Sequence, residues 1–322
     1  MNIDDGNSST KWAVVIFTSR ESLAVLTQAV QAATVAAFGK ADIDVLVNGN
    51  PSLATDLAAQ IGQQMQSQTT PAVRVRVWSV AVGDKANAWN QYIQRIWNGE
   101  EISFFIDGYV RLNPDAVGLL GEAVRSHKDV LGGTGVPTVG RTAAAMRRQM
   151  MESGGFHGNF CCIKGAVIEQ LRRRAIRLPL GLYRVDSLMG AFLSFGLQPE
   201  LGVWDHRRIL IHPQATWQTD PKRWWRWTDL RAKVKQLFRQ SRGVLENAAV
   251  KHHFVARKQS PERLLPTAAA LVLDWATRCP SQLKALLWHN PLARRELAEI
   301  RRSRSGAAAD QAPVLVASYR LP

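Results

Sequence analysis

The sequence predicts an α/β fold, in which a mostly parallel sheet is flanked by helices and followed by a basic, helical C-terminal region. Apolar, strand-like runs alternate with stretches of helical periodicity as far as Asp107, which favours parallel strands joined by right-handed crossovers. From about Lys222 onward, apolar residues recur with helical spacing among many Lys and Arg residues. The chain has 322 residues, 46% of them hydrophobic, so it can bury a large core. We expect two parts, residues 1–220 and residues 221–322.

The first part begins with four strands, each a short run of apolar or β-branched residues. They are Trp12–Phe17, Ile43–Val47, Val73–Val80 and Ile102–Ile106. The first helix repeats apolar residues every three or four positions and stops at Gly39, and Pro114 suits the first turn of the fourth helix. The first three helices are Ser22–Phe38, Leu53–Met65 and Lys85–Trp97.

Glycine pairs interrupt this alternation after residue 125, and we expect a loop-rich region there. A strand, a helix, a turn, another helix and a terminal strand complete the expected elements. They are Phe160–Ile163, Ala166–Ile176, Leu178–Gly181, Asp186–Phe195 and Val314–Tyr319.

Asp107 lies at the carboxyl end of the most apolar strand and is followed by Gly108. A carboxylate at the edge of an interior strand is costly unless it binds something. In open α/β sheets, ligands sit at the carboxyl ends of the strands. The segment therefore predicts a binding site, although a solvated carboxylate in an Asp-Gly turn is the alternative.

The cysteines and the longest apolar runs exclude several protein classes. Cys161, Cys162 and Cys279 are an odd set without CxxC spacing, which argues against a disulfide framework and a zinc site and predicts packing roles. No apolar run approaches the roughly 18 residues of a membrane span. The first strand follows Asp4 and Asp5 rather than a basic signal region. We expect a cytoplasmic protein, either free or peripheral to the inner membrane.

Five segments of the first part follow one another in an order and spacing that is typical of a known enzyme family. They are Phe17-Thr18-Ser19-Arg20, Asn48-Gly49-Asn50, the run from Gly83 to Asn90, Asp107-Gly108-Tyr109, and Arg184-Val185-Asp186-Ser187. This order resembles the family 2 type glycosyltransferases with the GT-A fold, a Rossmann-like architecture, and the resemblance covers roughly residues 12–215. In that family, the first of these segments holds the nucleotide and the second contacts its base. The third carries a Gly-Lys-Ala-x-Ala-Leu-Asn stretch, the fourth forms the DxD motif and the fifth supplies the catalytic base.

The resemblance implies an inverting glycosyltransferase of the hexosyltransferase class, acting in cell-surface polysaccharide or glycan synthesis. Its partners would be a nucleoside-diphosphate sugar donor and a carbohydrate or lipid-linked acceptor. Asp186 would be the catalytic base, since one positioned carboxylate is enough for a single inverting displacement. The implied nucleotide-sugar-binding residues are Thr18, Ser19, Arg20, Asn48, Asn50, Lys85, Asn90, Asp107, Gly108, Tyr109 and His157.

The resemblance also implies a metal cofactor, Mg²⁺ or Mn²⁺, because the departing diphosphate must be neutralised. Hard cations prefer oxygen ligands, so Asp107 would hold the ion, with His212 or His206 completing the shell. Alternatively, Arg207 and Arg208 could meet the phosphates directly.

Two residues depart from the family pattern, and two predicted site residues have ordinary alternatives. Tyr109 replaces the second Asp of the DxD motif, and Asn48 replaces the first acidic residue of the base-contacting cluster. Asp186 could serve only as a helix N-cap, a position that Asp favours. His157, in a glycine-rich loop, could be a local hydrogen-bonding residue.

The positive charge of the chain lies in its second half. Residues 1–150 hold 13 basic and 13 acidic residues, whereas residues 151–322 hold 28 and 13. Trp224, Trp225 and Trp227 stand among the basic residues between Lys222 and Arg242, which would suit peripheral contact with an anionic membrane. The alternative is that the aromatic face packs on the catalytic part and the charges are solvated.

Two other functions stay open at this stage. A nucleic-acid-binding protein could use tryptophan stacking in a positive groove. The sequence holds no helix-turn-helix, zinc-finger or RNP-like signature, so we expect no nucleic-acid partner. A catalytically inactive glycosyltransferase-like binding module would account for the altered DxD segment and for Asn48.

Overall fold

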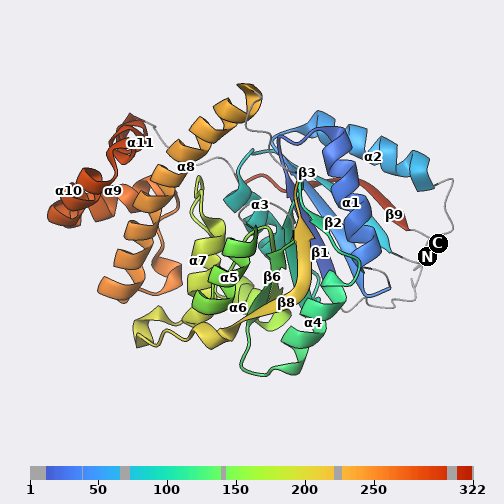
Figure 1. Ribbon diagram of the computed structural model, residues 1–322, viewed down its shortest axis with the longest axis horizontal. Helices are drawn as coiled ribbons and strands as arrows, with labels where there is room; N and C mark the ends of the chain where they lie inside the picture. The colour runs from blue at the N-terminus through green and yellow to red at the C-terminus, as the bar shows by residue number, and fades with distance from the viewer. Residues whose placement is uncertain are drawn as a thin grey trace.

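The protein is built around one nine-stranded sheet with the strand order β5-β8-β6-β7-β4-β1-β2-β3-β9 (Figure 1). The computed structural model describes residues 12–37, 39–65, 73–138, 143–220, 227–302 and 310–320. The strands are β1 (Trp12–Thr18), β2 (Ala41–Asn48), β3 (Arg74–Val80), β4 (Ile102–Asp107), β5 (Arg111–Leu112), β6 (Gly132–Pro137), β7 (Phe160–Lys164), β8 (Ile209–Gln218) and β9 (Val314–Arg320).

The four strands predicted first are adjacent and parallel, in the order β3-β2-β1-β4. Beyond β4 the sheet becomes mixed, because β7 runs antiparallel to both β4 and β6, while β6 and β8 are parallel. The predicted α/β fold with a mostly parallel sheet flanked by helices is confirmed. The parallel run brings the carboxyl ends of β1, β2, β3 and β4 to one edge of the sheet.

Strand β6 overturns the prediction of an irregular, loop-rich segment, since the glycines there form a buried strand. An added Cβ at Gly132 would lie 2.5 Å from the Cys162 carbonyl oxygen, and one at Gly135 would lie 2.3 Å from that of Ala215. The glycines therefore allow β6 to fit closely against its neighbours. A strand of this kind is not predicted from the residue pattern, because glycine has no side chain to mark it.

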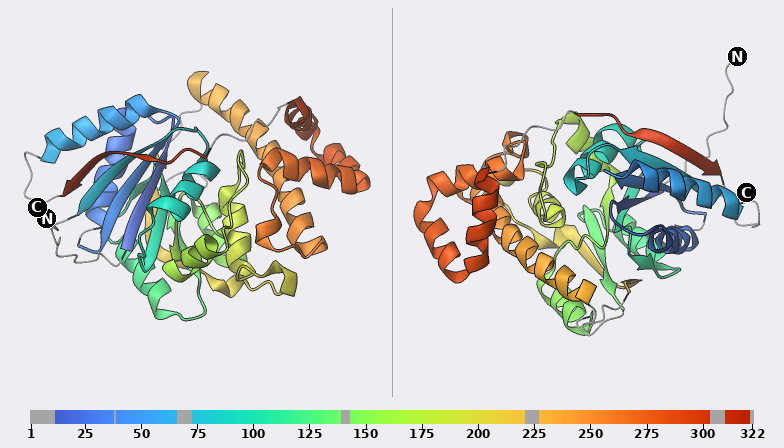
Figure 2. Two further views of the ribbon diagram at one scale, coloured as in Figure 1. Left: turned by 180° about the vertical axis from the view of Figure 1, so that it is seen from behind. Right: turned by 90° about the horizontal axis from the view of Figure 1, so that it is seen from above.

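Helices cover both faces of the sheet (Figure 2). One hydrophobic cluster joins the sheet to α1, α2 and α4, and a second joins its other face to α3, α6 and α7. The helices of this part are α1 (Leu23–Ala37), α2 (Pro51–Met65), α3 (Lys85–Gln91), α4 (Ala116–Ser126), α5 (Ala143–Ser153), α6 (Gly165–Arg173) and α7 (Val185–Ser194), with a π-helical turn η1 (Tyr92–Ile96) and short 3₁₀ turns η2 (Pro199–Leu201) and η3 (His206–Arg208).

A group of helices beside the sheet forms the predicted helical C-terminal region (Figure 1, orange to red). It has its own hydrophobic cluster, centred on Leu245, Val272 and Trp275. Its elements are α8 (Trp227–Lys251), η4 (His252–Ala256), η5 (Pro261–Arg263), α9 (Ala268–Arg278), α10 (Pro280–His289) and α11 (Pro291–Arg302). The predicted terminal strand is β9, which returns to the sheet and pairs antiparallel with β3. The end of the chain therefore returns to the sheet of the first part.

The tryptophan-rich segment that suggested membrane contact lies largely outside the described residues. Trp224 and Trp225 fall in the undescribed range 221–226, and Trp227 begins α8. In the part of the chain that the structure describes, no helix has the length and apolarity needed to cross a membrane. Peripheral membrane contact stays a prediction.

Candidate active site

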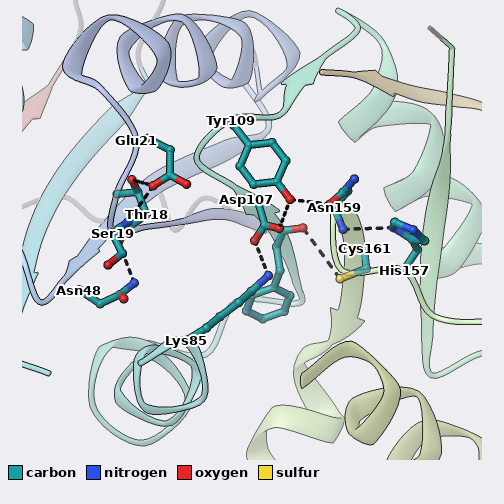
Figure 3. Close-up of polar contacts among 11 residues, drawn as sticks. Thr18, Ser19, Glu21, Asn48, Lys85, Asp107, Tyr109, His157, Asn159 and Cys161 are labelled. Carbon is teal, nitrogen blue, oxygen red and sulfur yellow. Dashed lines mark hydrogen bonds and ion pairs between the residues drawn. The ribbon is translucent and has the colours of Figure 1, made fainter. Parts of the chain in front are cut away.

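Asp107 ends β4 at the carboxyl edge of the parallel strands, where it is in register with Phe17 of β1. Its Oδ1 atom is ion-paired with the ammonium group of Lys85, and its Oδ2 atom accepts a hydrogen bond of 2.9 Å from the Tyr109 hydroxyl (Figure 3). Gly108 fits directly against Thr18, because an added Cβ would lie 2.7 Å from Thr18 Cβ. The carboxylate therefore sits between two donors on a tightly packed strand end.

Lys85 is the first residue of α3, which begins because the preceding Asp84 caps it. The Asp84 carboxylate accepts hydrogen bonds from the backbone N–H groups of Ala86 and Asn87. Burial alone would lower the pKa of Lys85, but the charge and hydrogen bond of Asp107, helped by Asp186, raise it above its ordinary value. Lys85 is therefore a permanent cation at neutral pH, with about a third of its side chain exposed (34%).

Asp186 and His157 belong to the same electrostatic neighbourhood. Burial lowers the pKa of His157, while Asp186 and Asp107 oppose that shift and Lys85 adds to it. The charge of Asp186 also raises the pKa of Lys85. Contacts of the segment 157–159 agree with this, because Gly158 lies against the Asp186 side chain, and the Tyr109 hydroxyl lies 3.2 Å from Asn159 Oδ1 and 2.9 Å from Asp107 Oδ2. The two carboxylates that the sequence singled out therefore lie near one region, one from β4 and the other from α7.

The Asp186 carboxylate forms no hydrogen bond with any side chain or backbone group of the described residues. It is the second residue of α7, whose N-cap is Arg184, so the alternative interpretation of Asp186 as the N-cap is wrong. The first turn of a helix is a favourable place for a carboxylate because the helix dipole is positive there. Gly158 touches the Asp186 side chain, and an added Cβ would lie 3.1 Å from Asp186 Cβ.

The His157 ring lies on the opposite side of Asp107 from the loop that follows β1 (Figure 3). It stacks on Trp217 with ring centroids 5.6 Å apart. Its Nδ1 atom accepts a 3.4 Å hydrogen bond from the Asn159 backbone N–H, so the neutral ring carries its proton on Nε2. Its Nε2–H group is a potential donor to a bound hydroxyl or phosphate.

The loop after β1 is held by Glu21, a residue that the sequence reasoning missed. One oxygen, Glu21 Oε2, accepts hydrogen bonds from the Thr18 hydroxyl (2.6 Å), the Ser19 N–H (2.8 Å) and the Arg20 N–H (3.0 Å). Burial would raise the pKa of Glu21, but these hydrogen bonds lower it below its ordinary value. The signal available in the sequence was an acidic residue at the start of the first helix, where it can bind free N–H groups.

Asn48 and Asn50 reach this loop from the end of β2. Asn48 is buried and donates a 2.7 Å hydrogen bond to the Thr18 carbonyl, and Asn50 donates one of 3.3 Å to that of Ser19. Asn50 also accepts from the Leu53 N–H at 3.2 Å and so caps α2. Both asparagines therefore hold the backbone of the loop after β1.

The loops after β2 and β3 meet at two glycines. An added Cβ at Gly49, which has a φ of 69°, would lie 2.5 Å from the Gly83 Cα atom. This contact requires glycine, because a left-handed φ and a close backbone approach coincide. It brings the predicted segments Asn48–Asn50 and Gly83–Asn90 together at the edge that holds Asp107.

The chain that leads into α7 is fastened from two sides. On α3, Asn90 is buried and forms hydrogen bonds to the Leu178 backbone in both directions, at 2.9 and 2.8 Å, and Asp84 accepts from the Gly181 N–H. Both polar groups of the buried Asn90 amide are used in this way, so Asn90 supports the segment before Asp186 rather than a ligand.

On α8, the buried Glu246 accepts hydrogen bonds from the Tyr183 N–H (2.9 Å), the Arg184 N–H (3.3 Å) and Arg242 Nε (3.0 Å). Burial raises the pKa of Glu246, although Arg242 and the two N–H groups counteract it. The C-terminal helical region is thus linked to the segment that leads to Asp186, which lies two residues after Arg184. Sequence reasoning missed this contact.

The structure does not bring His212 to Asp107. Its Nδ1 atom accepts from the backbone N–H groups of Gln214 (3.3 Å) and Ala215 (3.1 Å), so the ring supports an irregularity in its own strand. Strand β8 is three places from β4, and at about 4.8 Å per strand the two backbones are roughly 14 Å apart. Burial lowers the pKa of His212, with no contribution from Asp107 or Asp186.

The alternative that Arg207 and Arg208 meet the phosphates is also not supported. Both precede Ile209, which is in register with Gly132 and hence with the beginning of β4 rather than its end. They line a pocket at the opposite edge of the sheet, where Arg207 is paired with Asp205 at 3.0 Å. The prediction that Cys161 and Cys162 are core residues is confirmed, because both are fully buried.

The residues around Asp107 do not fit a divalent cation in this arrangement. An ammonium group and a phenol hydroxyl take up the two carboxylate oxygens, and Tyr109 stands where a second carboxylate would be. Within the described ranges, no group of three or more His, Cys, Asp or Glu residues could hold a metal ion. The predicted ligands Asp107 and His212 are not brought together.

Comparison with known proteins bears on the fold. Neither a scan against protein-family models nor a search of curated proteins gives a match. Among solved structures, the chain is similar to a mannosyltransferase from Pyrobaculum calidifontis in complex with GDP-Man and Mn²⁺, with a TM-score of 0.53 at 16% identity over 90% of this chain and 84% of that one. Two structures of glucosyl-3-phosphoglycerate synthase from Mycobacterium tuberculosis give TM-scores of 0.45 and 0.46 at 10% and 11% identity, covering 76% and 77% of this chain and 80% and 81% of theirs. The similarity to the mannosyltransferase shows that the two chains share an α/β fold.

Proposed function

We propose that this protein is an inverting glycosyltransferase that moves a sugar from a nucleoside-diphosphate donor to a hydroxyl group of a carbohydrate or lipid-linked acceptor. One observation supports this proposal above the others. A lysine-paired carboxylate, Asp107, and a second carboxylate without hydrogen-bond partners in the described structure, Asp186, face one region at the carboxyl edge of the sheet. In open α/β sheets, ligands bind at the carboxyl ends of the strands, which supports a nucleotide site at this edge.

The donor nucleotide would lie across the loops that follow β1, β2 and β3. Glu21, Asn48 and Asn50 fix the backbone of the first loop, so that it is ordered before the ligand arrives. Arg20 is exposed and forms no ion pair with another described residue, which leaves its guanidinium available for phosphate. Preorganised donors of this kind stabilise the charge that develops on the leaving diphosphate.

Asp186 would take the proton of the acceptor hydroxyl as that oxygen attacks the sugar. A single displacement requires the base and the departing diphosphate on opposite sides of the anomeric carbon, and the product then has the inverted configuration. His157, neutral and with its proton on Nε2, would hold a sugar or phosphate oxygen between the two carboxylates. The sugar is thereby oriented without a covalent intermediate.

The acceptor would approach from the side of the helical C-terminal region, which contacts the segment before Asp186 through Glu246. A carbohydrate or lipid-linked acceptor, a role in cell-surface polysaccharide or glycan synthesis, and peripheral contact with an anionic membrane belong to this proposal through the family resemblance alone.

A binding screen followed by a turnover screen tests the proposal. Thermal unfolding is followed with UDP, GDP and TDP, each in EDTA and in Mn²⁺, beside a short oligonucleotide. We expect one nucleoside diphosphate to raise the melting temperature, and the matching nucleotide sugars to release nucleoside diphosphate when acceptors are supplied. Nucleotide binding without turnover on any acceptor would support an inactive binding module. Stabilisation by the oligonucleotide alone, with a steep salt dependence, would support a nucleic-acid-binding protein.

A further inference from the structure

We propose that Lys85 takes the place of the divalent cation in this active site, so that the protein binds its nucleoside diphosphate and releases it after transfer without a metal ion. This inference rests on the proposed function and concerns the same site. It starts from what surrounds Asp107, the residue that would otherwise be the metal ligand.

Both carboxylate oxygens of Asp107 already have partners, and the fold holds each partner in place. Lys85 is anchored as the first residue of the capped helix α3, and its ammonium group is ion-paired with Oδ1. Tyr109 is two residues along the chain and donates to Oδ2 at 2.9 Å. A divalent ion bound to Asp107 would have to displace the ammonium group or lie beside it, where two cations repel each other.

The two other carboxylates near this edge, Glu21 and Asp186, have other roles. Glu21 accepts three hydrogen bonds that hold the loop after β1, so moving its carboxylate toward Asp107 would release that loop. Asp186 must keep an oxygen free for the acceptor proton. A single carboxylate holds a hard cation weakly, because such ions favour several oxygen ligands.

Lys85 has the charge and the freedom to serve a diphosphate. Its ammonium group has three donors, of which Asp107 uses one, and 34% of its side chain is exposed. The ion pair with Asp107 holds the ammonium group at the carboxyl end of β4. Lysine acts on phosphate as a point charge, which suits a bridging position between donor and carboxylate.

Asp186 and Lys85 are enough to account for the bonds and the proton of the transfer step. The bond between the anomeric carbon and the diphosphate oxygen breaks, and its electron pair stays on the diphosphate. A bond forms between the anomeric carbon and the acceptor oxygen, whose proton passes to Asp186. Lys85 keeps its proton and stabilises the diphosphate electrostatically, as a metal ion would.

The test is isothermal titration of UDP, GDP and TDP, in EDTA and in Mn²⁺, with four proteins: wild type, Lys85→Met, Lys85→Arg and Tyr109→Asp. Wild type should bind one nucleotide with dissociation constants within about twofold in the two buffers. Lys85→Met should lose at least about tenfold in EDTA, and Lys85→Arg should recover most of that loss because it restores the cation. Tyr109→Asp should bind more tightly in Mn²⁺ than in EDTA, since it supplies a second carboxylate.

Wild-type binding that needs Mn²⁺ and is abolished by EDTA would overturn the inference while leaving the glycosyltransferase proposal intact. Equal binding by Lys85→Met and wild type in EDTA would also overturn it. Absence of nucleotide binding in both buffers would overturn the proposed function, and this inference with it. Circular dichroism of each variant separates a folding defect from a loss of binding, and the arginine variant keeps the test decisive if Lys85→Met does not fold.

Discussion

Gly158 presses against the proposed catalytic base, so a single added methyl group should displace that base. In Gly158→Ala the new Cβ would lie 3.1 Å from Asp186 Cβ, 3.4 Å from its Cγ and 3.5 Å from its Oδ2. Carbon atoms favour separations of about 3.5–4.0 Å, so the side chain of Asp186 must move by roughly half an ångström. The backbone of Gly158 is not in the left-handed region, and alanine can adopt it without strain.

This displacement sets the expected size of the effect. Catalytic groups must be held within about 0.5 Å, and a misplacement of ~1 Å costs on the order of 10²-fold in rate. We therefore expect Gly158→Ala to lower kcat by roughly tenfold, which is about 1.4 kcal/mol of activation free energy. The free energy of unfolding should change by less than about 1 kcal/mol, because Asp186 is half-buried and can yield. Donor affinity should stay within about twofold of wild type.

The assay is the release of nucleoside diphosphate by wild type, Gly158→Ala, Asp186→Ala and the double variant. If the methyl group acts through the base, it should have no further effect when the Asp186 carboxylate is absent. Gly62→Ala is a matched control. Gly62 lies on α2, at the far edge of the sheet, and its added Cβ would also meet a side-chain atom at 3.1 Å, Tyr319 Oη. Wild-type turnover in Gly158→Ala, or a tenfold loss that persists without the Asp186 carboxylate, would refute the reasoning.

Three further predictions concern the support of the site and the stability of the fold. Glu246→Ala removes the acceptor for two backbone N–H groups before α7. We expect kcat to fall while donor affinity is retained, and the free energy of unfolding to fall by about 2 kcal/mol. Unchanged kinetics would contradict this expectation. Arg76→Met leaves the fully buried carboxylate of Asp44 without its 2.7 Å ion pair, and chemical denaturation should show a loss of about 3–5 kcal/mol, whereas a loss below ~1 kcal/mol would count against it. Burial lowers the pKa of His157, so the ring in the unfolded chain takes up a proton at a higher pH than the ring in the folded protein. The free energy of unfolding should therefore fall as the pH drops below about 6.5, and His157→Gln should flatten that part of the profile. An equally steep profile in the variant would argue against a buried, neutral ring.

Much of the fold could be predicted because the first half follows local rules consistently. The strands β1 to β4 are apolar runs followed by helices, and the topology of such units forces their carboxyl ends to one edge. Asp107 could be found for the same reason, since a carboxylate at that edge needs a partner. Its partner Lys85 lies on a segment that the family pattern singled out, although the ion pair itself was not foreseen.

The rest depends on contacts that no local pattern records. Strand β6 is built from glycines, whose lack of side chains removes the alternation that marks a strand. Glu246 reaches the backbone of Tyr183 from a helix 63 positions further along the chain, and neither residue carries a motif. His212 was predicted as a metal ligand through the family resemblance, but strand order puts it three strands from Asp107. Tertiary geometry, rather than residue type, decided each of these cases.

The central claim is that Asp186 takes the acceptor proton in a site whose donor is held by other residues. The most direct measurement compares kcat with the donor dissociation constant in Asp186→Asn, a variant that keeps the shape of the side chain but cannot accept a proton. We expect kcat to fall by about 10²–10⁴-fold while the dissociation constant stays within about twofold of wild type. Turnover at the wild-type rate in this variant would contradict it.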